Sequence, residues 1–239
     1  MTPERKARIE RVLKRRQPDF TLVTDYVHKG RNLSAIVRTA DAVGALDMHC
    51  VIGDKEYKAF RGTAKGSHGW VKVHRYTGLE AAIAPLKGAG YQIVAANLSE
   101  HSVDFREVDY CRPTALLLGA EKEGLSATGC ELADIEVTIP MVGMVQSFNV
   151  SVAAGIILSE VQRQRQLAGL YDHRRIDEGT YQRLSFEWGY PKLRHFCEHY
   201  GLSYPPLNEE GDLLEPSRWY ASVREQLGDR SLDFSEING

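Results

Sequence analysis

The residues best suited to chemistry stand where a long helical pattern begins, near the middle of the chain. Residues 139–151 read IPMVGMVQSFNVS, so an apolar strand ends at Pro140 and a loop containing Gly143 leads to Ser147 and Asn149. The first turn of a helix leaves backbone amides without partners, and such a loop can therefore hold a ligand against the helix start. Alternatively, Ser147 or Asn149 only caps the helix.

A second stretch, residues 32–40 (NLSAIVRTA), combines polar residues with an apolar helical stripe. Asn32 is a good N-cap, and the stripe predicts a helix over residues 33–43. Because each residue turns a helix by about 100°, Arg38 and Asn32 lie about 240° apart. Both reach one site only if Asn32 belongs to the preceding loop; otherwise Arg38 is expected to form a surface salt bridge.

A third stretch, residues 119–125 (GAEKEGL), directly follows the apolar strand ALLL. In α/β sheets ligands bind at the carboxyl ends of strands, and a glycine there lets the backbone approach a ligand closely. The spacing matches neither the dinucleotide-binding loop nor the P-loop. An ordinary charged surface turn is the alternative interpretation.

The elements that position these stretches predict an α/β domain. Near-continuous apolar strands separated by helices indicate a mostly parallel sheet that is covered on both faces. We expect strands near residues 48–52, 70–74, 91–96, 115–118 and 135–139, and helices near 33–43, 79–87 and 149–167. We assign residues 20–168 to this domain.

The two ends of the chain differ from this domain in composition. Residues 1–19 form a basic extension, with a helix predicted over residues 2–16 that carries seven basic residues against Glu4 and Glu10. Such a helix is either a solvated surface helix or a phosphate-binding arm. Residues 169–239 are predicted to be a helical extension, with helices near 178–186 and up to residue 200 and a poorly ordered acidic tail.

Several classes of protein are not expected. The four cysteines lie far apart without a C-x-x-C pair, which favours reduced thiols over a disulfide framework or a zinc ribbon. His195 and His199 flank Cys197 at helical spacing, but no third ligand motif lies nearby, so we expect no metal. No run approaches the roughly 18 apolar residues of a membrane span, and no signal peptide is recognisable. A cytoplasmic protein is therefore expected.

Together the three stretches resemble the three motifs of the SPOU class of SPOUT RNA methyltransferases. The resemblance to the tRNA guanosine 2'-O-methyltransferases of that class covers nearly the whole chain. It includes RRQPDFTL, VHKGRNLSAIVRTADAVG, VDFREVDY-x-RPT and QRQRQLAGLY in the flanking regions. The resemblance implies a deep trefoil knot at the carboxyl end of the α/β domain, a homodimer assembled through the knots, and S-adenosylmethionine bound inside.

The resemblance also assigns residues to the site. It implies Arg38 as the principal catalytic residue, with Asn32, Glu121, Ser147 and Asn149 shaping the site. The cofactor contacts that it implies, largely through the main chain, fall at Ala96, Asn97, Gly119, Ile139, Met144 and Phe148. The basic residues expected to grasp RNA are Arg5, Arg8, Arg11, Arg15, Arg16, Arg163, Arg165, Arg174 and Arg175.

The activity implied is transfer of a methyl group from S-adenosylmethionine to the ribose 2'-OH of guanosine 18 in the tRNA D-loop. Two alternatives remain open at this point. One is 2'-O-methylation of another RNA, either ribosomal RNA or a tRNA wobble base. The other is a non-catalytic RNA-binding paralogue that kept the fold.

Overall fold

The computed structural model describes residues 1–53 and 69–228, and the expectation of a poorly ordered acidic tail partly falls outside these ranges. The described chain forms two compact units. One is Arg15–Arg175, here called the catalytic unit; the other, called the extension unit, combines Met1–Lys14 with the chain from Ile176 onward.

The catalytic unit is built on a seven-stranded sheet, counted over the described residues. Its order is β3-β2-β1-β6-β4-β7-β5, and all the strand pairs are parallel. The strands are β1 Phe20–Asp25, β2 Asp47–Val51, β3 Lys72–Tyr76, β4 Gln92–Ala96, β5 Val103–Asp104, β6 Thr114–Leu118 and β7 Ile135–Thr138. The expected mostly parallel α/β sheet is therefore confirmed.

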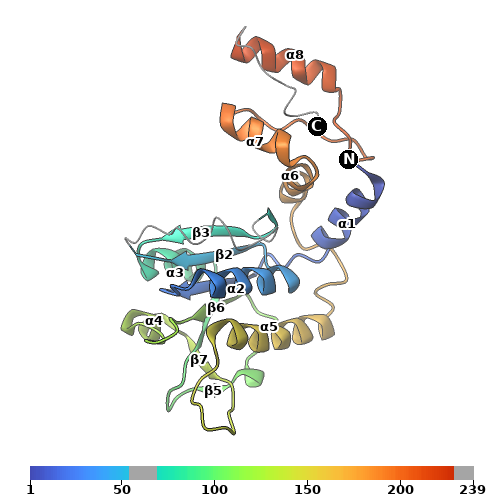
Figure 1. Cartoon of the computed structure of the whole chain (residues 1–239). Helices are drawn as coiled ribbons and strands as arrows, with labels where there is room; N and C mark the ends of the chain where they lie inside the picture. The colour runs from blue at the N-terminus through green and yellow to red at the C-terminus, as the bar shows by residue number, and fades with distance from the viewer. Residues whose placement is uncertain (54–68, 229–239) are drawn as a thin grey trace. The chain divides into compact units, whose positions relative to one another are not determined.

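Helices cover both faces of this sheet (Figure 1). α2 (Gly30–Ala42) and α5 (Val150–Leu167) pack together on one face, and α3 (Leu79–Gly88) and α4 (Ala127–Leu132) pack on the other. A short 3-10 helix, Phe105–Glu107, follows β5. Two apolar clusters fill the layers, one including Leu22 and Ile157 under α2 and α5, the other including Val23 and Ile83 under α3.

The interior strand β1 was not among the expected strands. It pairs with β2 on one side and β6 on the other, and Leu22 lies opposite both Met48 and Leu116. All six of its residues are buried. Its sequence, FTLVTD, mixes two threonines and an aspartate with apolar residues, so it lacks the continuous apolar run that identified its neighbours.

The extension unit is helical. Its helices are α1 Pro3–Leu13, α6 Glu178–Gly189, α7 Pro191–Tyr200 and α8 Pro216–Leu227. α1 packs on α6, and the Arg5 guanidinium donates a 2.7 Å hydrogen bond to the carbonyl of Trp188. Phe186, Leu193 and Cys197 form a small core between α6 and α7. The helices near 178–186 and up to residue 200 were expected, whereas α8 was not.

No helix in the described ranges is both long and apolar enough to cross a membrane. His195, Cys197 and His199 all lie on α7, where the Cys197 side chain is buried. Among the described residues no group of three or more His, Cys, Asp or Glu side chains could hold a metal ion.

Candidate active site

A pocket of about 330 Å³ lies in the catalytic unit, where β4, β6 and β7 end and α5 begins. This volume is within the range of small-molecule and cofactor sites. The lining includes the segments 96–98, 118–124 and 137–139, together with Met141, Gln146, Ser147, Phe148, Val150, Ala153 and Ile157. The first and third sequence stretches thus meet at one edge of the sheet, as the positions of their strands predicted.

Most of the residues that the resemblance assigned to cofactor contacts line this pocket. Ala96, Asn97, Gly119, Ile139 and Phe148 do so. Met144 does not line it, because its side chain projects fully into solvent from the loop between β7 and α5. Other lining residues were not expected, among them Leu98, Thr138, Met141 and Gln146. The available signal was their position at or after the ends of β4 and β7 and before α5.

Gly119 allows the loop after β6 to fold tightly. Ala120 and Gly124 exchange two backbone hydrogen bonds, of 2.7 and 3.0 Å, which closes the loop over Glu121, Lys122 and Glu123. A Cβ atom at Gly119 would lie 2.3 Å from the carbonyl carbon of Gly124. No side chain fits there, so glycine is required for the loop to form this wall of the pocket.

A chain of hydrogen bonds joins the three stretches. The Nδ2 group of Asn32 donates to Glu121 Oε1 over 2.5 Å, and Asn149 Nδ2 donates to Asn32 Oδ1 over 3.4 Å. Asn149 is also the N-cap of α5, and its Oδ1 accepts from the Ser151 amide at 2.9 Å and the Ser151 hydroxyl at 2.6 Å. Asn149 therefore caps α5 and also contacts Asn32, and its role in the site stays a prediction.

Glu121 is the acceptor at the end of this series of hydrogen bonds. Burial raises the pKa of its carboxyl group, but hydrogen bonds from its own amide, from Asn32 and from the amides of His28 and Lys29 outweigh burial and lower the pKa below its usual value. The carboxylate is therefore ionised at neutral pH and already accepts a hydrogen bond from Asn32. Such a group holds the turn before α2 in place and is a poor general base.

Asn32 and Arg38 lie on the same helix. α2 begins at Gly30 with Lys29 as its N-cap, so the expectation that Asn32 caps the helix or lies in a loop before it is wrong. The side chain of Asn32 is buried against Glu121, whereas Arg38 is exposed on another side of α2. Within residues 1–53 and 69–228, Arg38 makes no hydrogen bond or ion pair, and it does not line the pocket. Its guanidinium is available to a ligand.

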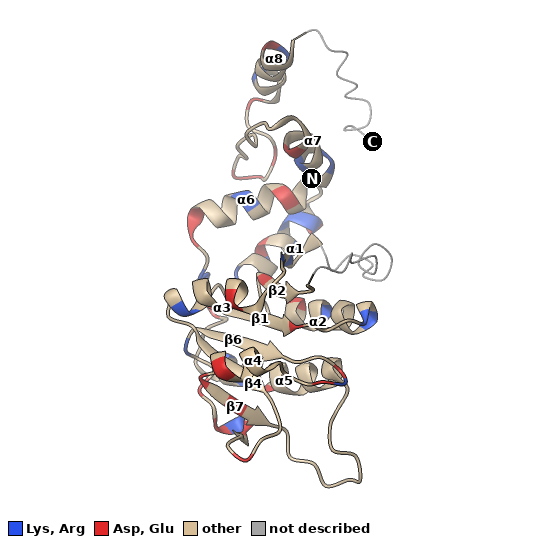
Figure 2. Ribbon diagram, turned by 90° about the vertical axis from the view of Figure 1, so that its left-hand side faces the viewer, with Lys and Arg blue, Asp and Glu red and all other residues tan. Residues whose placement is uncertain are grey.

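Ser147 lines the pocket and is exposed. Within the described ranges its hydroxyl has no hydrogen-bond partner, and it does not cap α5. The loop that carries it, between β7 and α5, has no charged residue and appears tan throughout in Figure 2.

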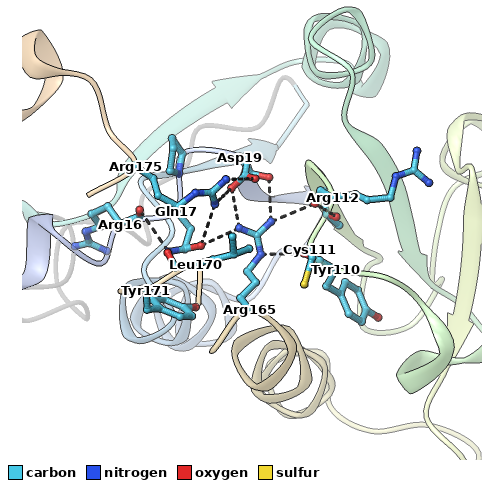
Figure 3. Close-up of polar contacts among 12 residues, drawn as sticks. Arg16, Gln17, Asp19, Tyr110, Cys111, Arg112, Arg165, Leu170, Tyr171 and Arg175 are labelled. Atoms are coloured by element: carbon cyan, nitrogen blue, oxygen red, sulfur yellow. Dashed lines mark hydrogen bonds and ion pairs between the residues drawn. The ribbon is translucent and has the colours of Figure 1, made fainter. Parts of the chain in front are cut away.

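Two of the arginines expected to grasp RNA are buried, and that expectation is corrected for both. Arg165 has no exposed surface: its guanidinium donates to Asp19 Oδ1 at 2.7 Å, to Gln17 Oε1 at 3.0 Å and to the carbonyl of Tyr110 at 2.9 Å (Figure 3). Arg16 is equally buried and pairs with Asp41 at 2.6 Å. A guanidinium without exposed surface cannot reach a phosphate, so both residues stabilise the catalytic unit instead.

The remaining arginines differ in their surroundings. Arg175 is mostly buried and joins Arg165 on Asp19, with bonds of 2.7 and 2.9 Å (Figure 3). Arg163 is largely exposed and pairs with Glu160 on the same helix. Arg174 is exposed in the catalytic unit, as is Arg15. Arg5, Arg8 and Arg11 are exposed on α1 of the extension unit, which carries basic residues along its length (Figure 2).

Comparison with known proteins identifies the family. The model of the SpoU rRNA methylase family matches residues 19–159, and the model of the SpoU rRNA methylase C-terminal region matches residues 163–216. The tRNA (guanosine(18)-2'-O)-methyltransferase of Escherichia coli (strain K12) is 47% identical over 226 residues, which cover 94% of this chain and 99% of that protein.

Solved structures agree with these matches. The crystal structure of the A. aeolicus TrmH/SpoU tRNA modifying enzyme has a TM-score of 0.74 at 43% identity, covering 80% of this chain and 97% of that one. The AdoMet-bound rRNA methyltransferase from Sinorhizobium meliloti has a TM-score of 0.56 at 33% identity, covering 64% and 59%. With the pocket and its three motifs in place, these matches show that the chain belongs to the SpoU rRNA methylase family.

Proposed function

We propose that this chain is a tRNA methyltransferase that transfers a methyl group from S-adenosylmethionine to the ribose 2'-OH of guanosine 18 in the D-loop. The observation that carries the proposal is the pocket where the segments 96–98, 118–124 and 137–148 converge beside the hydrogen-bonded Asn32, Glu121 and Asn149. The similarity to enzymes named for this reaction, which extends over nearly the full length of the E. coli protein, supports the same conclusion.

The pocket residues fit S-adenosylmethionine. The cavity has the volume of a cofactor site, and the close approach of Gly119 to Gly124 leaves main-chain groups, rather than side chains, at its wall. Ala96, Asn97, Gly119, Ile139 and Phe148 would hold the molecule there, and Met144 would do so only if its loop closes over the pocket. When bound, S-adenosylmethionine supplies an electrophilic methyl group carried on a sulfonium.

The chain's own residues must then align the ribose and deal with its proton. Arg38 grips the phosphate beside the target ribose with its planar guanidinium and so fixes the 2'-OH in line with the methyl group. The guanidinium is not the base, because it is a donor-only group that offers no acceptor for the proton. Glu121 is also unsuited, since its oxygens already accept several hydrogen bonds. The phosphate or a water molecule takes the proton.

A methyl-transfer assay tests the function. Unmodified tRNA is incubated with the protein and S-adenosylmethionine labelled in its methyl group, and the modified ribose is mapped. We expect label at guanosine 18. Label at a wobble base, or on ribosomal RNA alone, would show that a different RNA site is the substrate. RNA binding without methyl transfer would show that the chain is a non-catalytic paralogue. An Arg38→Lys variant is expected to lose turnover; near-normal turnover would refute the bidentate role of Arg38.

We further propose that the enzyme is a cytoplasmic homodimer assembled through a trefoil knot formed by the segments around the pocket. Membership of the family supports the knot. The loop between β7 and α5 exposes Val142, Met144 and Val145, and Val152 on α5 is also exposed, which is the composition of a protein interface. Sedimentation equilibrium is expected to give twice the chain mass, and Val145→Glu is expected to shift it toward the monomer.

The domain arrangement expected from the sequence leads to a further proposal, that the terminal extensions bind tRNA. Arg8 and Arg11 are exposed on α1. Each lost phosphate contact lowers the salt slope of binding by about 0.7 to 0.9, so an Arg8→Gln/Arg11→Gln variant should bind tRNA more weakly, with a slope lower by about 1.4 to 1.8. Arg106→Gln, an exposed arginine of the catalytic unit, is the matched control. An unchanged slope would show that α1 is a solvated surface helix and does not contact tRNA phosphates.

A further inference from the structure

The loop that follows β4 forms one wall of the pocket but has little core of its own. Asn97 and Leu98 line the pocket, and the side chain of Leu98 is 68% exposed. The loop closes on itself, because Ser102 Oγ donates to the carbonyl of Asn97 at 2.9 Å and accepts from the amide of Ser99 at 3.0 Å. These bonds fix the internal shape of the loop, but neither of them attaches the loop to the sheet.

Glu136, on β7, provides that attachment. Its Oε1 accepts from Asn97 Nδ2 at 3.1 Å, and its Oε2 accepts from the hydroxyl of Ser99. The only other bond from the loop to β7 among the described residues is between the Asn97 amide and the Val137 carbonyl, at 3.0 Å. Both side chains that reach from the loop toward β7 therefore end on the same carboxylate.

Glu136 acts from behind the pocket. Neighbouring residues of a strand point to opposite faces of the sheet. Val137 lines the pocket and packs in the core under α2 and α5, so Glu136 points to the opposite face. Consistent with this, Asn97 Nδ2 also lies 3.8 Å from Cys130 Sγ on α4, which covers that face. Glu136 is not among the residues that line the pocket.

We propose that Glu136 is a positioning residue for the methyl donor: its carboxylate holds Asn97 and Ser99 so that the loop after β4 presents its main chain to S-adenosylmethionine. This inference rests on the proposed function. Hydrogen bonds to a charged group are among the stronger ones, and removing the shared acceptor breaks two of them at once. Removing the Glu136 carboxylate is therefore expected to weaken binding of S-adenosylmethionine and to leave the methyl-transfer step itself unaffected.

The test measures binding of S-adenosylhomocysteine to the full chain by calorimetry, together with steady-state kinetics. Glu136→Ala is expected to weaken binding about tenfold to a hundredfold. It should raise the KM for S-adenosylmethionine by a similar factor and leave kcat within about twofold, because Glu136 does not reach the reacting atoms. Glu136→Gln keeps one acceptor oxygen and should recover most of the affinity. Glu131→Ala, an exposed carboxylate on α4, is the control and should change nothing.

A loss of kcat with an unchanged KM, or unchanged binding in Glu136→Ala, would overturn the inference. Should Glu136→Ala not fold, Ser99→Ala carries the test, because it removes one of the two bonds from a surface loop. It is expected to weaken binding about tenfold, and unchanged affinity would overturn the inference equally. If the wild-type chain bound no S-adenosylhomocysteine, the proposed function itself would fail, which is a different result from a variant that binds as well as the wild type.

Discussion

Replacing Arg165 with methionine tests whether the arginine cluster of Figure 3 stabilises the catalytic unit. Methionine retains the apolar stem of the side chain and removes the guanidinium. Asp19 keeps its two bonds to Arg175, and Gln17 Oε1 keeps a 3.2 Å bond from the same residue. Among the described residues, the carbonyl of Tyr110, which Arg165 reaches at 2.9 Å, is left without a partner. The carbonyl of Arg112 loses a 3.2 Å bond but keeps the hydroxyl of Thr114 at 2.8 Å.

The expected loss follows from these bonds. An unsatisfied buried acceptor costs about 1–3 kcal/mol, and truncating one partner of a buried ion pair costs about 3–5 kcal/mol. Because Asp19 retains Arg175, we expect the free energy of unfolding of the catalytic unit to fall by about 3–4 kcal/mol. With a urea m-value of about 2 kcal/mol/M, the midpoint would fall by about 1.5–2 M.

Urea denaturation followed by circular dichroism, at one fixed protein concentration, measures this shift. Arg163→Met is the matched control, since that guanidinium is 59% exposed and pairs only with Glu160 on its own helix; its loss should be below about 1 kcal/mol. Equal shifts for the two variants would refute the structural role of Arg165. So would an Arg165→Met protein that keeps its stability and loses tRNA binding, because Arg165 would then be a tRNA contact.

Three further predictions concern the same cluster and the pocket. Burial raises the pKa of Asp19, but hydrogen bonds and charges from Arg175 and Arg165 lower the pKa below its usual value. The stabilising contribution of Asp19 is therefore complete above about pH 4 and is lost as the pH falls further. In acid titrations followed by circular dichroism, the stability difference between wild type and Asp19→Asn should shrink below about pH 4. Gly119→Ala should weaken S-adenosylhomocysteine binding at least tenfold in calorimetry, because its Cβ would overlap Gly124, whereas Gly143→Ala, with open space around it, should change binding less than twofold; equal effects would exclude the steric reason. Glu121→Gln should lower kcat/KM about tenfold to a hundredfold while tRNA binding in a filter assay persists, because an amide NH2 would face the donor amides of His28 and Lys29; a fully active variant would contradict the anchoring role.

Much of the fold could be predicted from the sequence because parallel strands buried on both faces leave continuous apolar runs. The run ALLL before Gly119 became β6, whereas β7 before Pro140, with the sequence IEVT, is mostly half-buried and was predicted without such a run. β1 escaped prediction for the same physical reason, because it places polar residues inside the sheet: the hydroxyl of Thr21 donates to the carbonyl of Asp47 at 2.9 Å. Satisfied polar groups of this kind are invisible to a search for apolar runs.

The residue types in the site could be predicted, but their partners could not. Asn32, Glu121 and Asn149 were expected near the site, yet their chain of hydrogen bonds depends on loops that meet only in the folded state. The arginines were the weakest prediction, because exposed and buried arginines look alike in a sequence. Arg163 and Arg165 are two residues apart on α5, which turns them about 200° from each other; one faces solvent and the other Asp19.

The composition of the extension unit has a consequence for synthesis. Its first helix, α1, is made before the catalytic unit, but the segment it packs on begins only at Ile176, after the whole catalytic unit. At about 5–20 residues per second, α1 waits about 10 to 30 s for its partner. During that time Ile9 and Leu13, buried in the finished protein, remain available to chaperones or to other nascent chains. The chain of the catalytic unit is complete earlier, so this unit can fold first. The two segments of the extension unit are then joined through a folded catalytic unit.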